Sequence, residues 1–456
     1  MQDKRQKSLW DLLAEGEGEA RRAEQRETEA CTAGLETESP ATTGQLMEEI
    51  VSGENMRRAL KRVRSNKGAP GVDGMTVSDL GPHLIEHWPR YREQLLAGAY
   101  RPQPVKQVMI PKPDGGQRML GVPTVVDRLI QQAVLQVLQP QWDPTFSEHS
   151  YGFRPGRSAH QAIAAAQGII AEGHERVVDI DLEKFFDRVN HDILMSRVAR
   201  RVSDKRVLRL IRGFLTAGML VDGLVGPREQ GTPQGGPLSP LLSNLLLDEW
   251  DKELEARGHR FVRYADDCNI YVRSERAGQR VLASMTEWLS RRLRLQVNAS
   301  KSTVARPSAS KFLGFSFTGG KEPKRRVAPK ALKRFKERVR ELTRRTRGVS
   351  LDRMVGDLRD YLVGWRSYFG YCQTPSVLES LDGWIRRRLR CFQWKQWKRG
   401  TVRFRELRAR GLSRDHAAMA AATKAPWAAS RGPGLQTALP KAYLASLGLP
   451  TLAPSR

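Results

Sequence analysis

The stretch Tyr264-Ala265-Asp266-Asp267 decides the fold of this chain. Its two adjacent carboxylates lie between apolar runs, residues 260–263 and 268–272, that predict two strands. The acidic pair would then lie at the tip of a β-hairpin. Mg²⁺ prefers hard oxygen ligands in fixed geometry, which paired acids supply in two-metal phosphoryl-transfer sites. A solvated turn is the alternative, so the interpretation depends on a third carboxylate and on a surface for nucleic acid.

The composition points to a polyanionic partner. The chain has 456 residues and a net charge of +27, which favours nucleic acid first and an anionic membrane second. No run of about eighteen apolar residues exists and the first residues are polar, so we expect no membrane span and no secretion signal. The four cysteines include no C-x-x-C, which fits the cytoplasm and argues against structural zinc. We expect a cytoplasmic protein that associates with the nucleoid when it is bound to DNA.

The charge is unevenly distributed along the chain. Residues 1–50 carry 6 Lys/Arg and 12 Asp/Glu, a net charge of −6. Residues 321–410 carry 27 Lys/Arg and 9 Asp/Glu, a net charge of +18. Most of the basic surface therefore lies downstream of the acidic pair. A catalytic acidic centre with a separate basic surface is the layout of a polymerase, although other nucleic-acid enzymes share it.

The pattern of apolar residues divides the chain into four segments. Residues 1–52 are acidic, and we expect a short helix at 9–13 followed by a flexible stretch. Residues 53–325 mix strands and helices, and residues 326–400 predict basic helices, so we expect an α+β domain and an α-helical domain. Residues 401–456 form a basic segment with possible DNA-binding residues, namely Arg403, Arg405, Arg408 and Arg410.

Within the α+β segment, a hairpin joins strands at 105–110 and 117–122 through the turn at 113–116. The other expected elements are helices at 55–64, 129–138, 240–253 and 280–293, and strands at 177–182, 261–264, 269–272, 295–297 and 312–317.

A third carboxylate is available in the strand at 177–182. Asp179 and Asp181 lie on one face of that strand, because side chains alternate along it. One of them could oppose the hairpin turn on a neighbouring strand. Three carboxylates could then hold two metal ions roughly 3.5–4 Å apart, at the attacking 3′-hydroxyl and at the leaving pyrophosphate. Asp179 and Asp187 also fit roles at strand ends, so we select Asp181.

Further motifs follow the order found in reverse transcriptases. They are D-x-x-x-F-F-D from residue 181, G-T-P-Q-G-G-P-L-S-P at 231–240, Y-A-D-D at 264–267 and K-F-L-G-F at 311–315. The chain resembles the bacterial group II intron reverse transcriptases, or maturases, from about residue 55 to 400. Residues 66–74 resemble the N-terminal extension motif of that family and residues 151–158 its second block.

The resemblance implies a right-hand polymerase with fingers and palm, followed by an α-helical thumb/maturase domain. It implies that Asp181, Asp266 and Asp267 are catalytic and bind two Mg²⁺ ions, with Mn²⁺ as a possible substitute. Phe186 would lie under the sugar and exclude a 2′-hydroxyl, although core packing is its simpler role. Gln234 matches the glutamine that contacts the incoming nucleotide, and the glycines after it allow close backbone approach.

Other candidates for nucleotide binding are cationic. Lys112 and Arg118 flank the turn at 113–116, where they could clamp a triphosphate, although an exposed hairpin also carries charges for solubility. Lys301 matches a lysine of the family near the nucleotide. We expect Tyr264 to pack near the primer end, with cross-strand packing as the alternative.

The basic helical segment contains interleaved aromatic residues, and phosphate neutralisation with base stacking is how proteins hold RNA. Residues 362–369 resemble the maturase (X, thumb) motif, which implies binding of intron RNA. Ile385, Leu389 and Phe392 recur at helical spacing and are expected in the core. The aromatic candidates for stacking are Trp365, Tyr368, Phe369, Tyr371, Trp384, Trp394 and Trp397, and the cationic candidates for RNA binding are Arg386, Arg387, Arg388 and Arg390.

The motifs together predict a reverse transcriptase, an RNA-directed DNA polymerase and nucleotidyltransferase of a group II intron. Its partners would be the intron RNA, an RNA template, a DNA primer or target, and deoxynucleoside triphosphates. It would assist splicing and support retrohoming by target-primed cDNA synthesis. The alternatives are a free-standing or defence-associated reverse transcriptase, and a splicing-only RNA-binding maturase, against which the intact acidic triad argues.

Many relatives carry a Cys/His-rich HNH endonuclease after the thumb. This sequence has His416 alone beyond His259 and no C-x-x-C, so we expect no HNH endonuclease domain. Such a relative would need an existing 3′ end as its primer, for example a nascent strand at a replication fork.

Overall fold

The computed structural model describes residues 45–111, 115–221, 224–226, 228, 230–232 and 235–454. Two compact units contain them. The first unit takes the described residues up to Ala162 together with Arg176–Val304. The second unit takes Ile163–Glu175 and the described residues from Ala305 onward, so the helix α7 (Ala159–Ala171) contributes to both.

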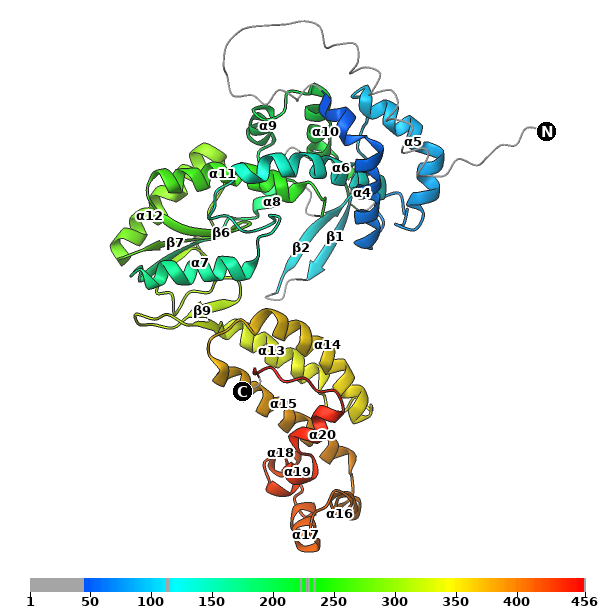
Figure 1. The fold of residues 1–456 in the computed structure, drawn as a ribbon, viewed down its shortest axis with the longest axis vertical. Coiled ribbons are helices and arrows are strands. Elements are labelled where there is room, and N and C mark those ends of the chain that lie inside the picture. Colours follow the sequence, from blue (N-terminus) through cyan, green and yellow to red (C-terminus); the bar gives the residue numbers. More distant parts are fainter. Residues whose placement is uncertain are drawn as a thin grey trace, which may run out of the picture. The chain divides into compact units, whose positions relative to one another are not determined.

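The first unit contains a four-stranded sheet with the order β6-β7-β3-β8 (Figure 1). Its strands are β6 (Arg260–Tyr264), β7 (Asp267–Val272), β3 (Arg176–Ile180) and β8 (Thr303–Ala305). The predicted hairpin is confirmed, because β6 pairs with β7 in antiparallel register with Tyr264 opposite Asp267. The strand β3 is antiparallel to β7, with Ile180 opposite Cys268. Asp181, the first residue after β3, therefore comes next to the hairpin turn.

The helix α11 (Ser239–Ala256) packs on β6. Its leucines and Trp250 are buried on every side of the helix, which is typical of a helix enclosed by protein. The polar residues of this helix that lie inside must then find partners, because an unpaired buried polar group is costly. The helix α12 (Glu275–Trp288) packs on β3 and β7 and continues into a π-helical turn, Leu289–Leu293.

A second sheet in the first unit has the order β2-β1-β4-β5. The predicted hairpin of β1 (Val105–Pro111) and β2 (Gln117–Val122) is confirmed, with Ile110 opposite Arg118. The strands β4 (Met219–Val221) and β5 (Leu224–Gly226) complete this sheet. The neighbouring helices include α4 (Gly53–Ser65), α5 (Leu80–Leu96), α6 (Val125–Trp142), α8 (Phe185–Arg188), α9 (His191–Ala199), α10 (Lys205–Thr216) and the 3₁₀ turn Asp143–Thr145.

Side-chain caps begin several of these helices. The Ser52 side chain accepts a hydrogen bond from the amide of Asn55 at the start of α4, and Thr124 accepts one from Asp127 at the start of α6. Each cap satisfies a backbone donor that has no partner within the helix. The sequence prediction placed the start of α6 four residues too late, because it followed the apolar pattern and not the cap.

Three further sequence predictions, one for a flexible segment and two for strands, also differ from the structure. The prediction of a flexible segment to residue 52 is wrong for α3 (Leu46–Ile50), whose apolar residues are buried and whose Met47 amide donates to Asp204 at 3.1 Å. The predicted strand at 295–297 is an isolated bridge between Leu182 and Val297. The predicted strand at 312–317 is shortened to β9 (Phe315–Phe317), because Phe312 pairs back onto Phe315. The predicted helix at 9–13 lies outside the described residues.

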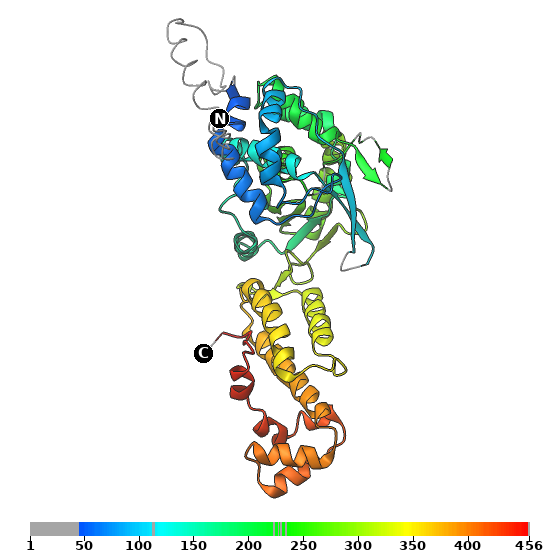
Figure 2. The same ribbon diagram turned by 90° about the vertical axis from the view of Figure 1, so that its right-hand side faces the viewer.

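The second unit is mainly helical, as predicted (Figure 2). Its largest helices are α13 (Pro329–Leu342), α14 (Leu351–Phe369) and α15 (Pro375–Gln396), which share one hydrophobic core. The antiparallel pair β9 and β10 (Arg325–Val327) belongs to this unit. The boundary between the units thus lies at residue 305, earlier than the predicted boundary at 326, because the short β9–β10 pair packs with the helices.

The chain beyond residue 400 folds into further helices with their own core around Trp394, Trp397 and Leu439. Leu452 and Ala453 return to α15, where their amides donate to the Asp382 carboxylate at 2.9–3.1 Å. The elements beyond residue 400 were predicted as helical only to about residue 410, because the Ala-, Pro- and Gly-rich segments of the last 40 residues are short. They are α16 (Gly400–Ala409), α17 (Arg414–Ala421), α18 (Pro426–Ala429), α19 (Pro433–Ala438) and α20 (Lys441–Ser446).

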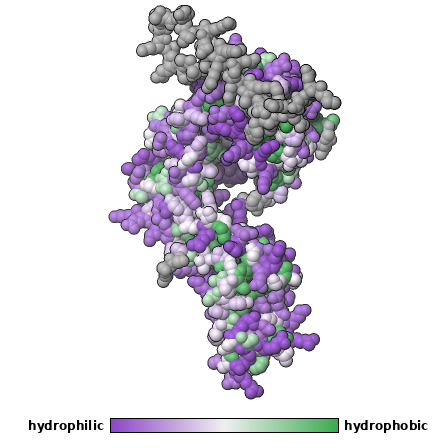
Figure 3. Space-filling model, turned by 45° about the vertical axis from the view of Figure 1, so that its right-hand side comes forward, coloured by the Kyte–Doolittle hydropathy of each residue, from purple (hydrophilic) through white to green (hydrophobic). Residues whose placement is uncertain are grey.

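Hydrophilic residues cover most of the coloured surface on the face drawn in Figure 3. In the part of the chain that the structure describes, no helix is both long enough and apolar enough to cross a membrane. Three cysteines, Cys268, Cys372 and Cys391, are free thiols.

Candidate active site

The acidic pair lies in a turn with unusual backbone geometry. Ala265, which precedes Asp266, has a φ of +58°. This left-handed conformation costs a residue with a side chain about 1–2 kcal/mol. Such a conformation persists where the surrounding structure determines it, and it is enriched at functional sites.

The Asp266 carboxyl lies in the electrostatic field of two other predicted site residues. Its pKa is raised, chiefly because burial disfavours the charged form. Arg118 opposes this shift, whereas the Asp181 carboxylate adds to it. Strands β3 and β7 thus bring Asp181 and Asp266 together, and the β1–β2 hairpin brings Arg118 within electrostatic reach.

The segment after α12 fixes Asp181. The amide of Asp181 donates to Ser302 Oγ at 3.0 Å, and its carbonyl accepts from the amide of Asn298 at 2.8 Å. Lys301 Nζ lies 3.5 Å from Asp181 Oδ2, with side chains 62% and 32% exposed respectively. A pair this exposed contributes about 0–1 kcal/mol to stability. We predicted Lys301 near the nucleotide, and the structure places it beside the Asp181 carboxylate.

The protein supplies only some of the ligands that a Mg²⁺ ion needs at this site. Among the described residues, no group of three Asp, Glu, His or Cys side chains is gathered closely enough to hold a metal ion. Mg²⁺ is commonly bound by one or two carboxylates together with substrate phosphates and water. The approach of Asp181 to Asp266 supplies such a pair, and like charges held together favour a cation between them.

A pocket of about 940 Å³ lies in the first unit. Phe186 and Arg118 line it, together with Gly235 and Gly236 from the G-T-P-Q-G-G-P-L-S-P motif at 231–240. None of its described lining residues is acidic, and five are cationic, which suits a polyanionic ligand. The cationic residues are Arg58, Lys61, Arg62, Arg118 and Arg128.

The two phenylalanines of the D-x-x-x-F-F-D motif have different surroundings. Phe185 is in the core, and its ring lies edge-on to Phe186 with the ring centres 5.1 Å apart. Phe186 is 8% exposed and lines the pocket. Its place in the pocket wall is compatible with a steric barrier to a 2′-hydroxyl, and this role stays a prediction.

Arg128 is a site residue that sequence reasoning missed. Its Nη2 donates to the carbonyl of Ala69 at 2.6 Å, and a Cβ at Gly68 would lie 2.1 Å from its Nη1. Gly68 therefore lets the N-terminal extension motif pack onto Arg128. No sequence signal marked Arg128, because its partner Ala69 lies on a distant segment that only the fold brings to α6. Gly236 similarly approaches Gln131, whose Oε1 would be 2.3 Å from an added Cβ.

Other predicted residues contribute less to the site. Lys112 and Gln234 lie outside the described residues. Tyr264 is half-buried and lies opposite Asp267 in the hairpin, which agrees with the alternative role of cross-strand packing. Its contact with a primer end stays a prediction.

In the second unit, two of the four predicted RNA-binding arginines bond to the protein itself. Arg388 Nε donates to Thr343 Oγ1 at 2.5 Å, and Arg390 Nε donates to the Leu439 carbonyl at 3.1 Å. Arg387 lies over the Trp427 ring at 5.4 Å. These interactions stabilise the helical unit, and RNA contact by the four arginines stays a prediction.

Among the other residues predicted to contact nucleic acid, three tryptophans are buried and three arginines bond to the protein itself. Trp365, Trp394 and Trp397 are buried, so stacking of RNA bases on them is ruled out in this conformation, whereas Phe392 is in the core as predicted. Large aromatic rings bury much apolar area, and these three tryptophans contribute that burial to the core of the helical unit instead of lying at the surface. Arg403, Arg408 and Arg410 donate to Trp397 O, Leu412 O and the Glu406 carboxylate, so these three hold the C-terminal helices together.

A basic pocket of about 710 Å³ in the second unit was not predicted. Six of its lining residues are cationic, and no described lining residue is acidic. The cations come from the α13–α14 loop, α15 and the α16 region, so only the fold brings them together. They are Arg344, Arg345, Arg388, Lys395, Lys398 and Arg403.

Comparison with known families agrees with this geometry. Residues 110–317 match the family described as reverse transcriptase (RNA-dependent DNA polymerase), and residues 332–411 match the group II intron, maturase-specific domain. These two segments fall on the first unit with β9, and on the helical part of the second unit.

Similar proteins occur in bacteria and plants. Protein YkfC of Escherichia coli (strain K12) is 40% identical over 218 residues, which are 46% of this chain and 57% of that protein. The group II intron-encoded protein LtrA of Lactococcus lactis subsp. cremoris is 36% identical over 197 residues, 42% of this chain and 32% of LtrA. Nuclear intron maturase 2, mitochondrial, of Arabidopsis thaliana is 28% identical over 177 residues, 30% of this chain and 24% of that protein.

The matches span less than two thirds of each of these relatives. The two family segments include the acidic hairpin at 260–272, the G-T-P-Q-G-G motif from residue 231 and most of the helical region beyond residue 331. The resemblance read from the motifs is confirmed: the chain carries a reverse transcriptase domain followed by a group II intron maturase-specific domain, and it is homologous to the group II intron-encoded protein LtrA.

Proposed function

We propose that the chain is an RNA-directed DNA polymerase of a group II intron that also binds its intron RNA, assists splicing and supports retrohoming by target-primed cDNA synthesis. The observation that carries the proposal is the approach of Asp181 to Asp266 beside a pocket lined by cations. The partners would be the intron RNA, an RNA template, a DNA primer or target, and deoxynucleoside triphosphates. The protein would work in the cytoplasm, at the nucleoid when it is bound to DNA.

The acidic residues define the chemistry. Asp181, Asp266 and Asp267 would hold two Mg²⁺ ions, or Mn²⁺ in their place, which would activate the primer 3′-hydroxyl and stabilise the pyrophosphate that leaves. Arg118 is close enough to Asp266 to affect its pKa, and it would donate to the triphosphate as a bidentate fork. Lys301 would exchange its contact with Asp181 for a phosphate oxygen when the nucleotide arrives.

The pocket also explains the choice of sugar. Phe186 lines the wall of a space whose other described contributors include five cations, three glycines and both polar and apolar side chains. A bulky ring at that wall would leave room for a 2′-hydrogen and clash with a 2′-hydroxyl. Phe186 would therefore select deoxynucleotides.

The basic pocket supports a role in RNA binding. Its six cations gather without an acidic side chain among the described lining residues, and burial and Arg340 lower the pKa of Arg388. Phosphates bound there would relieve this repulsion and release counterions. We propose that it contacts the phosphate backbone of the intron RNA.

Primer extension on poly(rA)/oligo(dT) with Mg²⁺ tests the polymerase proposal. Asp181→Asn and Asp266→Asn should each abolish extension, because each removes a charged ligand. The control is Asp192→Asn, which removes an exposed carboxylate paired with Arg212 and should leave extension unchanged. Extension that survives Asp266→Asn would refute the assignment of the metal ligands.

The alternatives differ from the proposal in the RNA that they need. A splicing-only maturase would bind intron RNA with no primer extension, whereas a free-standing reverse transcriptase would extend primers with no intron beside its gene. The test compares the affinity of the protein for the intron RNA that flanks its gene with its affinity for an unrelated RNA of equal length. A preference for the intron RNA separates an intron-encoded protein from a free-standing reverse transcriptase. Equal affinities would overturn the intron assignment and leave the polymerase assignment standing.

A further inference from the structure

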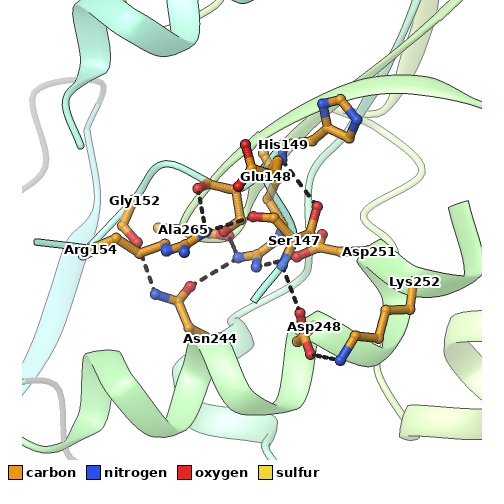
Figure 4. A network of polar contacts seen from close by, with 12 residues as sticks. Ser147, Glu148, His149, Gly152, Arg154, Asn244, Asp248, Asp251, Lys252 and Ala265 are labelled. Carbon is orange, nitrogen blue, oxygen red and sulfur yellow. Dashed lines mark hydrogen bonds and ion pairs between the residues drawn. The ribbon is translucent and has the colours of Figure 1, made fainter. Parts of the chain in front are cut away.

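Arg263 lies near the end of β6, three residues before Asp266, and its side chain is 0% exposed. Figure 4 shows its partners Asp251, Asn244 and Ala265. Its Nε and Nη2 donate to the two carboxylate oxygens of Asp251, at 2.7 and 2.5 Å. Its Nη1 donates to the carbonyl of Ala265 at 2.8 Å and to Asn244 Oδ1 at 3.1 Å. One guanidinium thus joins the helix α11 to the peptide between Ala265 and Asp266.

Stability alone is a poor reason for this arrangement. Taking an arginine and an aspartate out of water is costly, and replacing a buried ion pair by apolar residues is often neutral or stabilising. The elements that carry the pair, β6 and α11, are otherwise rich in fully buried apolar side chains, such as Phe261 and Trp250. A hydrophobic residue at position 263 would pack in this core, but it would offer no donor to the Ala265 carbonyl.

The other side of the turn is held by residues 149–152. Asn244 Nδ2 donates to the Gly152 carbonyl at 2.9 Å, and a Cβ at Gly152 would lie only 2.2 Å from the Ala265 amide nitrogen. The backbone of this segment also pairs with Arg263, since Tyr151 N donates to Arg263 O at 2.9 Å. The left-handed Ala265 is therefore held by the close approach of Gly152 to its amide nitrogen and by the hydrogen bond from the Arg263 guanidinium to its carbonyl.

We propose that Arg263, oriented by Asp251 and Asn244, is a positioning residue that holds the Ala265–Asp266 peptide so that the Asp266 carboxylate faces Asp181. The proposal rests on the proposed function of these carboxylates as metal ligands. Arg263 itself touches neither metal nor substrate. Its fork is needed because a single ammonium cannot donate to the Asp251 carboxylate and the Ala265 carbonyl in this geometry.

The test compares variants in steady-state primer extension, with Mg²⁺ and dTTP titrated separately. Arg263→Lys keeps the charge that pairs with Asp251 but lacks the fork. We expect the Mg²⁺ concentration for half-maximal rate to rise, and kcat to fall by roughly 10- to 100-fold, the effect of losing a hydrogen bond from a charged group. The KM for dTTP should stay within twofold. Full activity of Arg263→Lys at low Mg²⁺ would overturn the proposal.

A matched control lies one turn away on the same helix. Asp248 is a buried carboxylate like Asp251, but it pairs with Lys252 at 2.6 Å and accepts from the Ser147 amide (Figure 4). Asp248→Asn should lower the melting temperature, less than Asp251→Asn because Lys252 is half-exposed, without changing the Mg²⁺ requirement. An equal Mg²⁺ shift in both variants would reduce the Arg263 effect to loss of stability and overturn the proposal. If Asp251→Asn does not fold, Asn244→Ala tests the same link with the ion pair intact.

A second measurement separates this proposal from the polymerase activity. Electron paramagnetic resonance of free Mn²⁺ gives the affinity of the unliganded protein, with Asp266→Asn as the reference for specific binding. We expect Arg263→Lys to weaken the Asp266-dependent binding by about 10-fold. If Arg263→Lys weakens Mn²⁺ binding but the wild-type chain extends no primer, the polymerase assignment is refuted and the positioning role stands. Unchanged binding in Arg263→Lys would refute the positioning role alone.

Discussion

Gly152→Ala should displace the acidic turn without unfolding the protein. An added Cβ would lie 2.2 Å from the Ala265 nitrogen and 2.9 Å from the Tyr264 carbonyl carbon, both backbone atoms. An ordinary contact at about 3.4 Å requires one of the two segments to move by about 1.2 Å. A misplacement of about 1 Å at a reaction centre costs about 100-fold in rate. Overpacking adds about 1–3 kcal/mol of destabilisation, which a unit of this size tolerates.

The assay is primer extension under single-turnover conditions, with the melting temperature recorded for each variant. The control is Gly156→Ala in the same loop, where φ is +69° and no atom lies within 4 Å of the added Cβ. That change should cost about 1 kcal/mol through backbone strain and leave the rate unchanged. Equal rates for the two variants would refute the claim that the turn position limits catalysis.

Three other predictions follow from separate parts of the structure. Phe186→Val should admit ribonucleotides in primer extension, and unchanged discrimination between dTTP and UTP would leave Phe186 a packing residue. Burial raises the pKa of Asp127 to about 6. Its protonation therefore stabilises the folded state fully below about pH 4, and this contribution is lost as the pH rises towards 6. Asp127→Asn should flatten the pH dependence of the free energy of unfolding, measured in urea between about pH 4 and 6, and an unchanged slope would contradict this assignment. Arg345→Ala should weaken intron RNA binding and reduce the slope of log Kd against log salt by about one, whereas Arg291→Ala, an exposed arginine of the first unit, should leave both unchanged.

The acidic hairpin was predictable because it rests on local signals. Apolar alternation gives strands β6 and β7, and the same period places Asp179 and Asp181 on one face of β3. The selection of Asp181 required only that β3 pair with β7, which the register of Ile180 with Cys268 shows. These predictions depend on the near neighbours of each residue, which the sequence displays directly.

Arg263 was not identified as part of the site, although the sequence carries a signal for its surroundings. Asn244, Asp248 and Asp251 recur at helical spacing within a run of buried leucines on α11. A polar stripe on a helix that is otherwise apolar indicates partners inside the core. The partner itself lies on another element, so pairing Asp251 with Arg263 needs the tertiary fold. The same reason hides the basic pocket, whose cations come from three segments.

The arginines show that charge alone does not separate structural roles from binding roles in this chain. The prediction of nucleic-acid contact by Arg390, Arg403 and Arg408 used their charge, yet each donates to a backbone carbonyl that ends a helix or a turn. Such bonds satisfy carbonyls that helix ends leave without partners, so these arginines stabilise the unit.

Arg263 performs the same operation at a different place. It too donates to a backbone carbonyl, but that carbonyl belongs to a left-handed alanine adjacent to Asp266. Asp251 and Asn244 fix the guanidinium. Gly152 has no Cβ, so its backbone can lie close to the backbone of Ala265. A buried ion pair, a strained residue and a close-approach glycine, each unfavourable alone, therefore meet at one peptide. Their shared consequence is a fixed direction for the Asp266 carboxylate, and a metal-dependent polymerase has a use for that direction that a merely stable fold does not.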